Sequence, residues 1–534
     1  MRKIRIISLF VACLLTMEAC IKDDINVEDT TYNRSLNFAA PVFNIAADYM
    51  TIFNSLSDKE QHESIISADD DGMLYVQYSA DYSVKWNSIV NLNTYNDVFN
   101  TPIPTVSGEN VNQLLEFRHN LNGDNTTRID SVIISKAKLK LTASALPIAG
   151  TATLKINELS INGSVLSTSW EIDEGLEQTI DLSGYYLKPQ QVADSSYTNC
   201  KIRIVGQCEK TAVTDFNFKM EMADIEPQVA FGFFGQNEVF NQSGTQHLGF
   251  FSEYKVPRSI KLKGMKINLT VDNHTGTSFN VQMADMRVKC DENETKDVHF
   301  LDSNNIFVDQ IRYVDFLADG NANPMRNQYL LDSANSNCDE ILNSSPLDFI
   351  YNLKVESNPK GEVQENFITS ETQLDAKVDV FIPFWFCIYD LNRQDTINFS
   401  INDIILDDDN AMYIDTMKLS LKFSNGFPFS FSTQGYLTDE NYNVVDSLFT
   451  GVQKLWKMPE FDENLRVSKW GVQDTDIIMD SDKVARCSSG DVKYVILNTT
   501  VTSQEMPGKY FKLYDNYGLN MRFAIEVVGK YKSE

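Results

Sequence analysis

Strict alternation of apolar and polar side chains is the feature that most narrows the folds open to this sequence. The run Ala137–Ser144 alternates without a fault, and Met417–Phe423 does the same. Successive side chains of a β-strand point to opposite faces, so each run has one face for a core and one for water. That arrangement is common in antiparallel sheets. The chain is therefore predicted to be mainly β, with tandem antiparallel β-sandwich-like domains.

A third alternating run, Ile260–Val271, slips in phase at Gly264-Met265. A β-bulge at this glycine would restore the register. Each of the three runs is followed by a short turn, with the residue types of tight hairpins, and then by a second alternating run. These second runs are Thr151–Ile156, Phe279–Val281 and Phe429–Phe431. The loose repeat predicts at least two β-domains of similar plan.

One N-terminal segment has a different period. Phe43–Ser57 places Tyr49, Ile52, Phe53 and Leu56 at helical spacing, which predicts a short amphipathic helix before the strands begin. The expected organisation is a signal peptide at 1–19, a tether at 20–42, a first β-domain with this helix at 43–255, and a second β region at 256–534. A further division near 415 is left open.

The first residues have the pattern of an export signal. Three basic residues precede the apolar run Ile6–Met17, which ends at Ala19-Cys20. The run is too short to span a bilayer, which takes about 20 apolar residues, and is typical of a cleaved signal peptide. The strongest later apolar cluster, Val380–Ile388, is also too short for a transmembrane helix.

A cysteine directly after the cleavage point resembles the signal of bacterial lipoproteins, in which Cys20 becomes the lipidated N-terminus. The next residues, Ile21–Asp24, resemble the surface-export signal of Bacteroidetes lipoproteins. Asn425–Leu448 is similar to repeats of uncharacterised Bacteroidetes lipoproteins of β-sandwich type. Glu18 departs from the lipoprotein pattern, which usually has a small residue there. The resemblance implies an outer-membrane protein that is lipid-anchored and faces the cell exterior, and it carries no known activity.

The charge balance restricts the partners. The chain has 46 Lys and Arg residues against 74 Asp and Glu residues, for a formal net charge of −28. Such a surface repels nucleic acid and anionic lipid, so no nucleic-acid partner is expected. The N-terminal lipid is the one membrane contact that we expect. The hydrophobic content of 43% is enough for packed cores.

The sequence offers no recognisable metal, cofactor or catalytic motif. It lacks G-x-S-x-G, the P-loop and G-x-G-x-x-G. Acidic clusters such as Asp69–Gly72 lack the EF-hand spacing and are predicted to be solvated turns. The cysteines after Cys20 form no C-x-x-C pair and are expected to be buried free thiols, with a Cys200–Cys208 bridge left open. They are Cys200, Cys208, Cys290, Cys338, Cys387 and Cys487.

Aromatic residues are the remaining candidates for binding. Exposed rings can stack on the apolar faces of sugars. Trp456 and Trp470 flank the loop-like stretch Met458–Phe461 and are predicted to be exposed binding residues. Phe384–Phe386, which includes Trp385, lies in an apolar run and is predicted to be core.

Three functions remain open from the sequence. The first is a non-catalytic binding or adhesion role toward a glycan, a host surface or a partner protein. The second is a surface glycan-degrading enzyme, whose paired carboxylates cannot be identified from sequence spacing. The third is a lipid-carrying or envelope scaffold protein. An exposed aromatic patch would favour binding, converging carboxylates would favour an enzyme, and a wide apolar groove would favour a lipid carrier.

Overall fold

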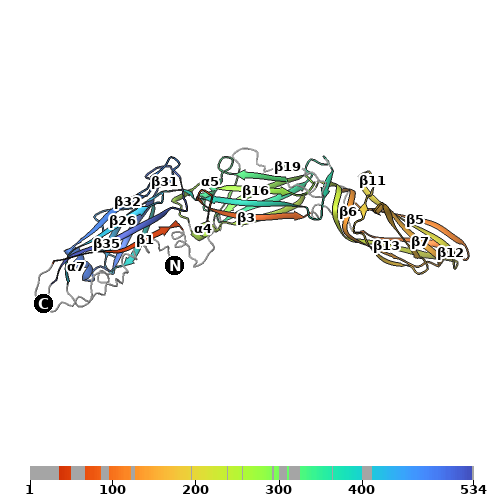
Figure 1. Cartoon of the computed structure of the whole chain (residues 1–534), viewed down its shortest axis with the longest axis horizontal. Helices are drawn as coiled ribbons and strands as arrows, with labels where there is room; N and C mark the ends of the chain where they lie inside the picture. The colour runs from red at the N-terminus through yellow and green to blue at the C-terminus, as the bar shows by residue number, and fades with distance from the viewer. Residues whose placement is uncertain are drawn as a thin grey trace.

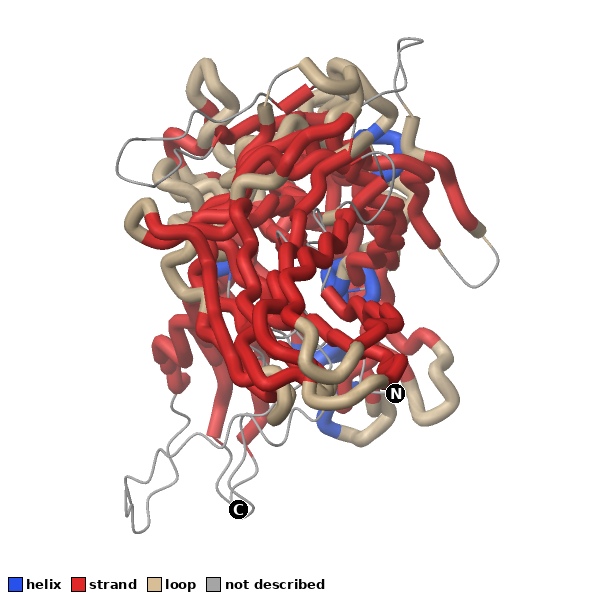
Figure 2. The backbone as a smooth tube through the Cα atoms, turned by 90° about the vertical axis from the view of Figure 1, so that its right-hand side faces the viewer, coloured by secondary structure: helices blue, strands red, loops and turns tan. Residues whose placement is uncertain are grey.

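The protein is a row of three β-lobes (Figure 1). The computed structural model describes residues 35–49, 66–85, 95–121, 127–193, 195–236, 238–254, 256–290, 294–299, 310–311, 325–363, 365–399 and 412–531. Strands dominate these residues, and the helices among them are short, as the tube in Figure 2 shows. The prediction of a mainly β chain with antiparallel sandwich-like domains is confirmed. Cys20 and the predicted export signals lie outside the described residues.

The terminal lobe contains the first and the last described strands. One sheet has the order β1 (Ser35–Asp48), β35 (Gly518–Tyr531), β26 (Met412–Asn425), β32 (Gly471–Asp480). The other has the order β25 (Leu391–Asn398), β33 (Tyr494–Thr502), β27 (Ser430–Thr438), and the far edge of β27 pairs with β28 (Val444–Ser447) and β29 (Gln453–Trp456). The lobe also contains the hairpin β30 (Glu460–Phe461), β31 (Val467–Lys469) and the helix α7 (Ser481–Ser488).

The middle lobe has two sheets of the same kind. One has the order β2 (Ile66–Ala68), β3 (Leu74–Lys85), β23 (Gln373–Pro383), β16 (Lys266–Asn273), β20 (Met325–Leu331). The other has the order β14 (Glu238–His247), β21 (Asp348–Ser357), β17 (Phe279–Lys289), β18 (Thr295–Asp297), and β19 (Gln310–Ile311) also pairs with β17. The helices α4 (Gly249–Tyr254) and α5 (Cys338–Leu342) belong to this lobe.

The distal lobe lies at the far end of the row from β1 and β35, the first and last described strands (Figure 1). One layer has the order β4 (Tyr95–Thr105), β13 (Ala212–Phe234), β6 (Thr127–Ala143), β9 (Leu176–Asp181). The other has the order β5 (Asn110–Asn120), β12 (Ser195–Cys208), β7 (Ile148–Ile161), β8 (Ser164–Glu171). The short strand β10 (Tyr186–Leu187) pairs with both β6 and β7 and joins the layers, and β11 (Gln190–Val192) pairs with β12.

All three lobes follow one plan. When the main strands of a lobe are numbered in chain order, one sheet has the order 1-8-3-6 and the other 2-7-4-5. This is the strand order of a double-sheet jelly roll. The strands that followed the three alternating runs in the sequence, β7, β17 and β27, are strand 4 of their lobes and lie in the opposite layer from strand 3. The loose repeat seen in the sequence therefore reflects a real structural repeat. The turn between strands 3 and 4 of each lobe crosses from one layer to the other and does not close a hairpin within one sheet.

The lobes are nested in the chain. After β1, the chain builds both other lobes before β25 resumes the terminal lobe, and after β3 it builds the distal lobe before β14 resumes the middle lobe. Only the distal lobe, at 95–234, takes its main strands from one continuous stretch. The predicted division into 43–255 and 256–534 follows chain order, whereas the sheets combine strands from both ranges. The division left open near 415 falls inside β26.

Aromatic side chains connect the two layers of each lobe. In the distal lobe the rings of Phe99 and Phe117 lie 4.1 Å apart between centroids. In the middle lobe the hydroxyl groups of Tyr82 and Tyr351 are hydrogen-bonded at 2.7 Å. In the terminal lobe a tryptophan occupies the corresponding place, as described below.

Backbone hydrogen bonds tie the lobes together at both junctions. Between the middle and distal lobes, β22 (Asn366–Ile368) pairs with Ala230–Gly232 at the end of β13. Between the terminal and middle lobes lies a three-stranded sheet, here called the waist sheet, with the order β15 (Ile260–Leu262), β24 (Trp385–Ile388), β34 (Phe511–Lys512). Beside it, the Leu74 amide donates to the Leu513 carbonyl at 2.9 Å.

Two local predictions near the N-terminus are wrong. Residues Phe43–Asp48, predicted as the start of a helix, continue β1, and Ser35–Val42, predicted as tether, begin it. The cause is pairing with β35, which is continuous apart from one irregularity between Pro41 and Phe43. Tyr49 is helical, and the rest of the predicted helix to Ser57 lies outside the described residues.

The bulge predicted at Gly264 is also wrong. The chain leaves the waist sheet after Leu262 and enters the middle lobe at Lys266, so two separate strands explain the slip in phase. Gly264 has φ = +84°, a left-handed conformation that favours glycine. It allows the chain to change sheets there.

The prediction of buried free thiols is confirmed for five of the six cysteines after Cys20, and Cys290 is free but only half-buried. Within the described part of the chain, no helix is long and apolar enough to cross a membrane.

Candidate functional site

Trp456 is not the exposed residue that the sequence predicts. It ends β29 with 5% of its surface exposed. Its ring lies 4.5 Å from that of Phe423 on β26 and 5.0 Å from that of Phe431 on β27. Because these two strands belong to opposite sheets, Trp456 fills the core of the terminal lobe.

Trp470 is 39% exposed, as predicted. Its indole lies on Gly426: a methyl group at that position would sit 2.7 Å from Cε2, 2.9 Å from Cζ2 and 3.0 Å from Nε1. These nearly equal distances place Gly426 against the face of the ring. The two tryptophans do not form one exposed platform, since Trp456 is core, and a binding role for Trp470 stays a prediction.

A different surface of the terminal lobe carries polar side chains that are uncharged. On the outer face of the sheet β25-β33-β27, Gln394, Asn498 and Gln434 lie opposite one another in one row. In the next row, Asn392 and Thr500 lie opposite Ser432. We call these six residues the amide face.

The amide face borders a hollow of about 370 Å³. Four of its lining residues, Asn392, Gln394, Asn498 and Thr500, belong to the amide face, and the other two are Arg393 and Thr499. The Thr500 hydroxyl donates to Asn392 Oδ1 at 2.6 Å, which orients that amide. The guanidinium of Arg393 bonds the carboxylate of Asp395, with Nε 2.8 Å from Oδ2, so its charge is balanced within the protein.

Gln434, which lies opposite Asn498 in the first row, carries an unused acceptor. Its side chain is 9% exposed, and its Nε2 donates to the Phe449 carbonyl at 3.3 Å. Its Oε1 is buried and has no hydrogen-bond partner among the described residues. A buried polar atom without a partner costs free energy, so a ligand hydroxyl that reached it would be favoured.

The corresponding sheets of the other lobes are charged on their outer faces. In the distal lobe the equivalent rows include Glu116, Lys201 and Arg203. In the middle lobe they include Lys354 and Glu356. The next row on the terminal lobe is Thr396, Ile496 and Tyr436, which is again uncharged. The lack of charge is therefore particular to the rows formed by β25, β33 and β27, and it ends at the sheet edge, where Lys454 of β29 lies opposite Ser432 and pairs with Glu505.

This geometry suits hydrogen bonding and not acid-base chemistry. Amide side chains offer donors and acceptors together, and hydroxyl groups do the same. The residues that line the hollow include no carboxylate, whereas glycoside hydrolysis normally needs two. Across the described residues, no group of three or more His, Cys, Asp or Glu side chains is placed to hold a metal ion.

Part of the amide face could have been predicted from the sequence. In Leu391–Asn398 the alternate residues Asn392, Gln394, Thr396 and Asn398 are polar but uncharged, which is unusual in so acidic a chain. The rows themselves could not be predicted, because they depend on the register between strands that are far apart in the chain.

Comparisons with known proteins give no family. The chain matches no family model and no curated protein. Among solved structures it is similar to a protein from Parabacteroides distasonis that is assigned as secreted, with 10% identity, a TM-score of 0.29, and coverage of 80% of this chain and 99% of that one. An infectious bursal disease virus structure shares 10% identity over 90% of this chain and 88% of that one, with a TM-score of 0.14. A structure of Sulfolobus Turreted Icosahedral Virus shares 9% sequence identity over 85% of this chain and 97% of that one, with a TM-score of 0.12. Likeness at this level carries no conclusion on function.

Proposed function

We propose that this chain is a lipid-anchored cell-surface protein that binds a neutral glycan without cleaving it. The observation that carries the binding role is the amide face and its hollow in the terminal lobe. The surface location rests on the signal peptide, Cys20 and the Lys22-Asp23-Asp24 run that follows.

A neutral glycan suits this surface because every group on the amide face can bond a hydroxyl and none carries a charge. Binding pockets usually combine an apolar area with a few polar groups that set orientation. Tyr436 and Ile496, in the adjoining row, are half-buried and supply that apolar area. A charged ligand would lose hydration there without gaining an opposite charge.

The test is retention of the purified mature protein in gels that contain neutral polysaccharides such as dextran, mannan or laminarin. The double variant Asn498→Ala/Gln394→Ala removes two neighbouring amides from one row. Each net hydrogen bond contributes about 0.5–1.5 kcal/mol, so we expect affinity to fall about tenfold or more. Reducing ends measured in the same samples should not increase.

The matched control is Gln282→Ala/Asn241→Ala. These two amides flank Lys354 in one row of the corresponding sheet of the middle lobe. This variant should retain the wild-type affinity. Equal affinity of the wild type and the Asn498/Gln394 variant would overturn the proposed site, and release of reducing ends would overturn the non-catalytic role.

The anchor has a separate test. Replacing Cys20 with alanine should release the protein from the membrane fraction of the producing cell into the soluble fraction. Unchanged partitioning would contradict the lipid anchor while leaving the glycan site untouched.

A further inference from the structure

A second surface, at the junction between the terminal and middle lobes, has the opposite character from the amide face. The outer face of the waist sheet carries Lys261 and Lys263 beside β24 and Lys512 on β34. Trp385 lies directly opposite Lys512, and the Lys263 amide donates to the Trp385 carbonyl at 2.9 Å. Tyr510 precedes β34. We call these five residues the waist patch.

Aromatic rings hold the lysines in place. The Lys263 Nζ lies 3.9 Å from the ring centroid of Trp385 and 4.8 Å from that of Tyr510. The Lys512 Nζ lies 5.4 Å from the Trp385 centroid. A cation over an aromatic face is attracted to it but keeps its charge. Two ammonium groups are therefore ordered without being neutralised.

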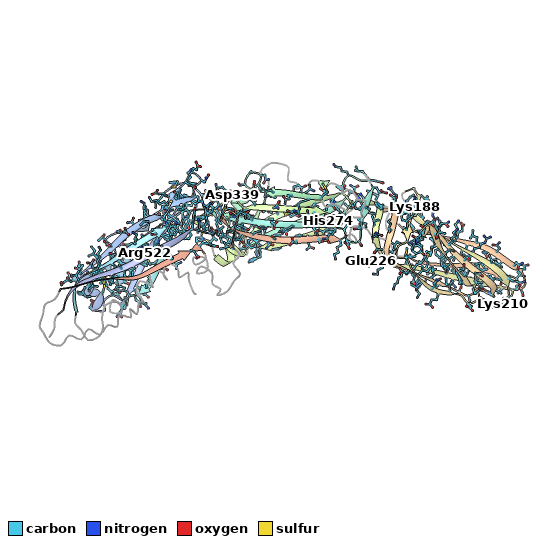
Figure 3. All side chains as sticks on the ribbon, viewed as in Figure 1. Lys188, Lys210, Glu226, His274, Asp339 and Arg522 are labelled. Atoms are coloured by element: carbon cyan, nitrogen blue, oxygen red, sulfur yellow. The ribbon has the colours of Figure 1, made fainter. Side chains whose placement is uncertain are left out.

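No described carboxylate forms an ion pair with a lysine of the patch, although the charge of Asp339, after the larger effect of burial, helps to raise the pKa of Tyr510. Among the described residues, no ion pair is formed by Lys261, Lys263 or Lys512, although the chain has an excess of acidic residues. Asp339, which Figure 3 labels at this junction, contacts the backbone instead. Its Oδ1 accepts the Gly264 amide at 2.7 Å.

The patch offers ring surface next to its positive charge. Trp385, predicted as core, is only half-buried, although its neighbours Phe384 and Phe386 are buried as predicted. Tyr389, which follows β24, is 44% exposed. Rings beside ammonium groups suit a ligand that has both flat apolar faces and anionic substituents.

An acidic peptide fits less well. Peptides commonly add a strand to a free sheet edge, but the free edge of β15 is occupied. The Leu262 amide donates to Asn343 Oδ1 at 2.9 Å, and Asn343 Nδ2 donates to the Leu262 carbonyl at 2.8 Å. The side chain of Asn343 thus takes the place of a neighbouring strand.

From this arrangement we propose that the waist patch binds an anionic polysaccharide, with sulfate or carboxylate groups at the lysines and sugar rings against the exposed ring of Tyr389. The site is distinct from the amide face and does not depend on it. On an acidic molecule, it combines a local cluster of positive charge with aromatic rings that hold two of the ammonium groups.

The experiment compares retention of the full mature chain by dextran sulfate, neutral dextran and poly-aspartate. The test variant is Lys261→Gln/Lys263→Gln/Lys512→Gln. The matched control is Lys155→Gln/Lys188→Gln/Lys210→Gln, which makes the same change in net charge on exposed lysines of the distal lobe; Figure 3 labels Lys188 and Lys210 there. Thermal unfolding of both variants confirms that they fold.

We expect the wild type to bind dextran sulfate, the test variant to bind about tenfold more weakly, and the control to stay within about twofold. The binding should weaken as salt is added, because the contacts are ionic and exposed. The Asn498→Ala/Gln394→Ala variant should bind dextran sulfate like the wild type, which separates this site from the amide face. No binding by the wild type, or equal losses in both lysine variants, would overturn the proposal. Tighter binding to poly-aspartate would overturn the glycan assignment in favour of an acidic protein.

Discussion

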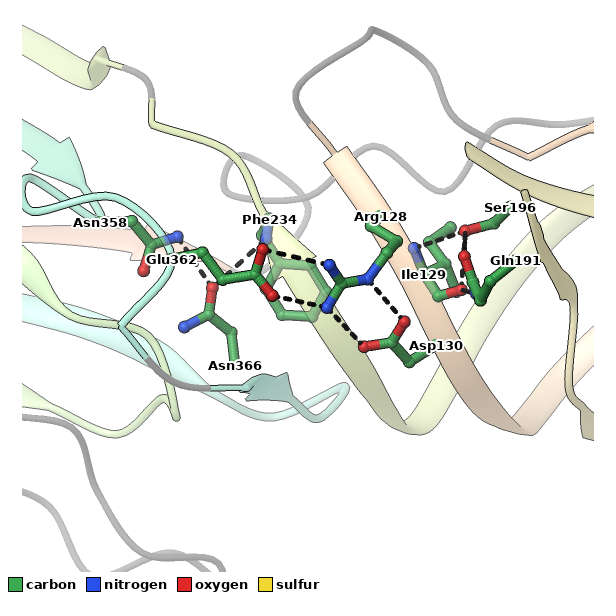
Figure 4. Close-up of polar contacts among 9 residues, drawn as sticks. All are labelled: Arg128, Ile129, Asp130, Gln191, Ser196, Phe234, Asn358, Glu362 and Asn366. Carbon is green, nitrogen blue, oxygen red and sulfur yellow. Dashed lines mark hydrogen bonds and ion pairs between the residues drawn. The ribbon is translucent and has the colours of Figure 1, made fainter. Parts of the chain in front are cut away.

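Arg128 and Glu362 join two lobes through a two-pronged ion pair. Arg128 begins β6 of the distal lobe, and Glu362 follows the middle-lobe strand β21. The guanidinium Nη1 lies 3.1 Å from Glu362 Oε2 and Nη2 lies 2.7 Å from Oε1 (Figure 4). Asp130 holds the same guanidinium from the other side, with Nε 2.8 Å from its Oδ1. These carboxylates, Asp130 foremost, raise the pKa of Arg128 above its ordinary value.

Glu362→Gln tests whether this ion pair sets the angle between the lobes. The pair is partly exposed, so the free energy of unfolding should fall by less than about 1 kcal/mol. The distance between spin labels on the middle and distal lobes should become more widely distributed. Glu226→Gln breaks a comparable ion pair with Lys136 inside the distal lobe and should leave that distribution unchanged. A distribution unaffected by Glu362→Gln would mean that β22 alone holds the junction.

The two tryptophans should respond to truncation in opposite ways. Trp456→Ala removes a side chain packed between Phe423 and Phe431 and should cost about 3–5 kcal/mol in denaturant unfolding. Trp470→Ala removes a half-exposed ring and should cost about 1 kcal/mol or less. Similar losses in the two variants would contradict the burial described for Trp456.

His119 should make stability depend on pH. It lies on β5 beside Asp97 of β4, with 12% of its side chain exposed. Burial lowers the pKa of His119, and this effect outweighs the opposing effect of Asp97. The unfolded chain therefore binds a proton more readily than the folded one. Its stabilising contribution is present above the unfolded pKa of about 6.5 and is lost as pH falls through the lower folded pKa.

The measurement is denaturant unfolding between about pH 7 and pH 5, where an ordinary histidine titrates. The free energy of unfolding of His119→Gln should fall less between about pH 7 and pH 5 than that of the wild type. His247→Gln is the control, since that side chain is 63% exposed beside Asp348. If the free energy of unfolding changed with pH equally in His119→Gln and the wild type, His119 would not contribute to the pH dependence of stability.

Removing one hydroxyl of the Tyr82–Tyr351 pair should lower the free energy of unfolding more than removing both. Tyr351 is 1% exposed, and burial raises the pKa of its hydroxyl. Tyr82→Phe leaves that hydroxyl without this partner and should cost about 1–3 kcal/mol. The double variant Tyr82→Phe/Tyr351→Phe should recover part of the loss, as a double-mutant cycle would show. Strictly additive losses would contradict the coupling.

The distal lobe should fold alone. Its main strands are continuous in the chain between Tyr95 and Phe234, so none must wait for a distant partner. A fragment of these residues should unfold cooperatively in denaturant. Deleting 35–48 from the full chain should instead destabilise the terminal lobe, because β35 would lose the partner that it has along β1. A distal fragment without a cooperative transition would contradict this division.

The sequence predicted the strands better than their connections. Alternation in Ala137–Ser144 and Met417–Phe423 identified β6 and β26, because burial of one face is a local property. Nothing local in Leu36 or Asn37 shows that they pair with Gly529 and Val528 near the other end of the chain. For the same reason the amide face went unpredicted: Gln394, Asn498 and Gln434 meet only through register. Trp456 was wrongly predicted to be exposed because it precedes a loop-like stretch. Its contacts with Phe423 and Phe431 depend on the packing of two sheets, which the local sequence does not show.

The nesting of the lobes has a consequence for how the protein is made. β1 leaves the ribosome early, but its partner β35 begins only at Gly518. At about 5–20 residues per second, synthesis of the intervening chain takes roughly half a minute to a minute and a half. Throughout that interval β1 lacks the strand with which it pairs in the folded protein and could pair wrongly. The terminal lobe can therefore be completed only after β35 has been made, later than the last strands of the other two lobes.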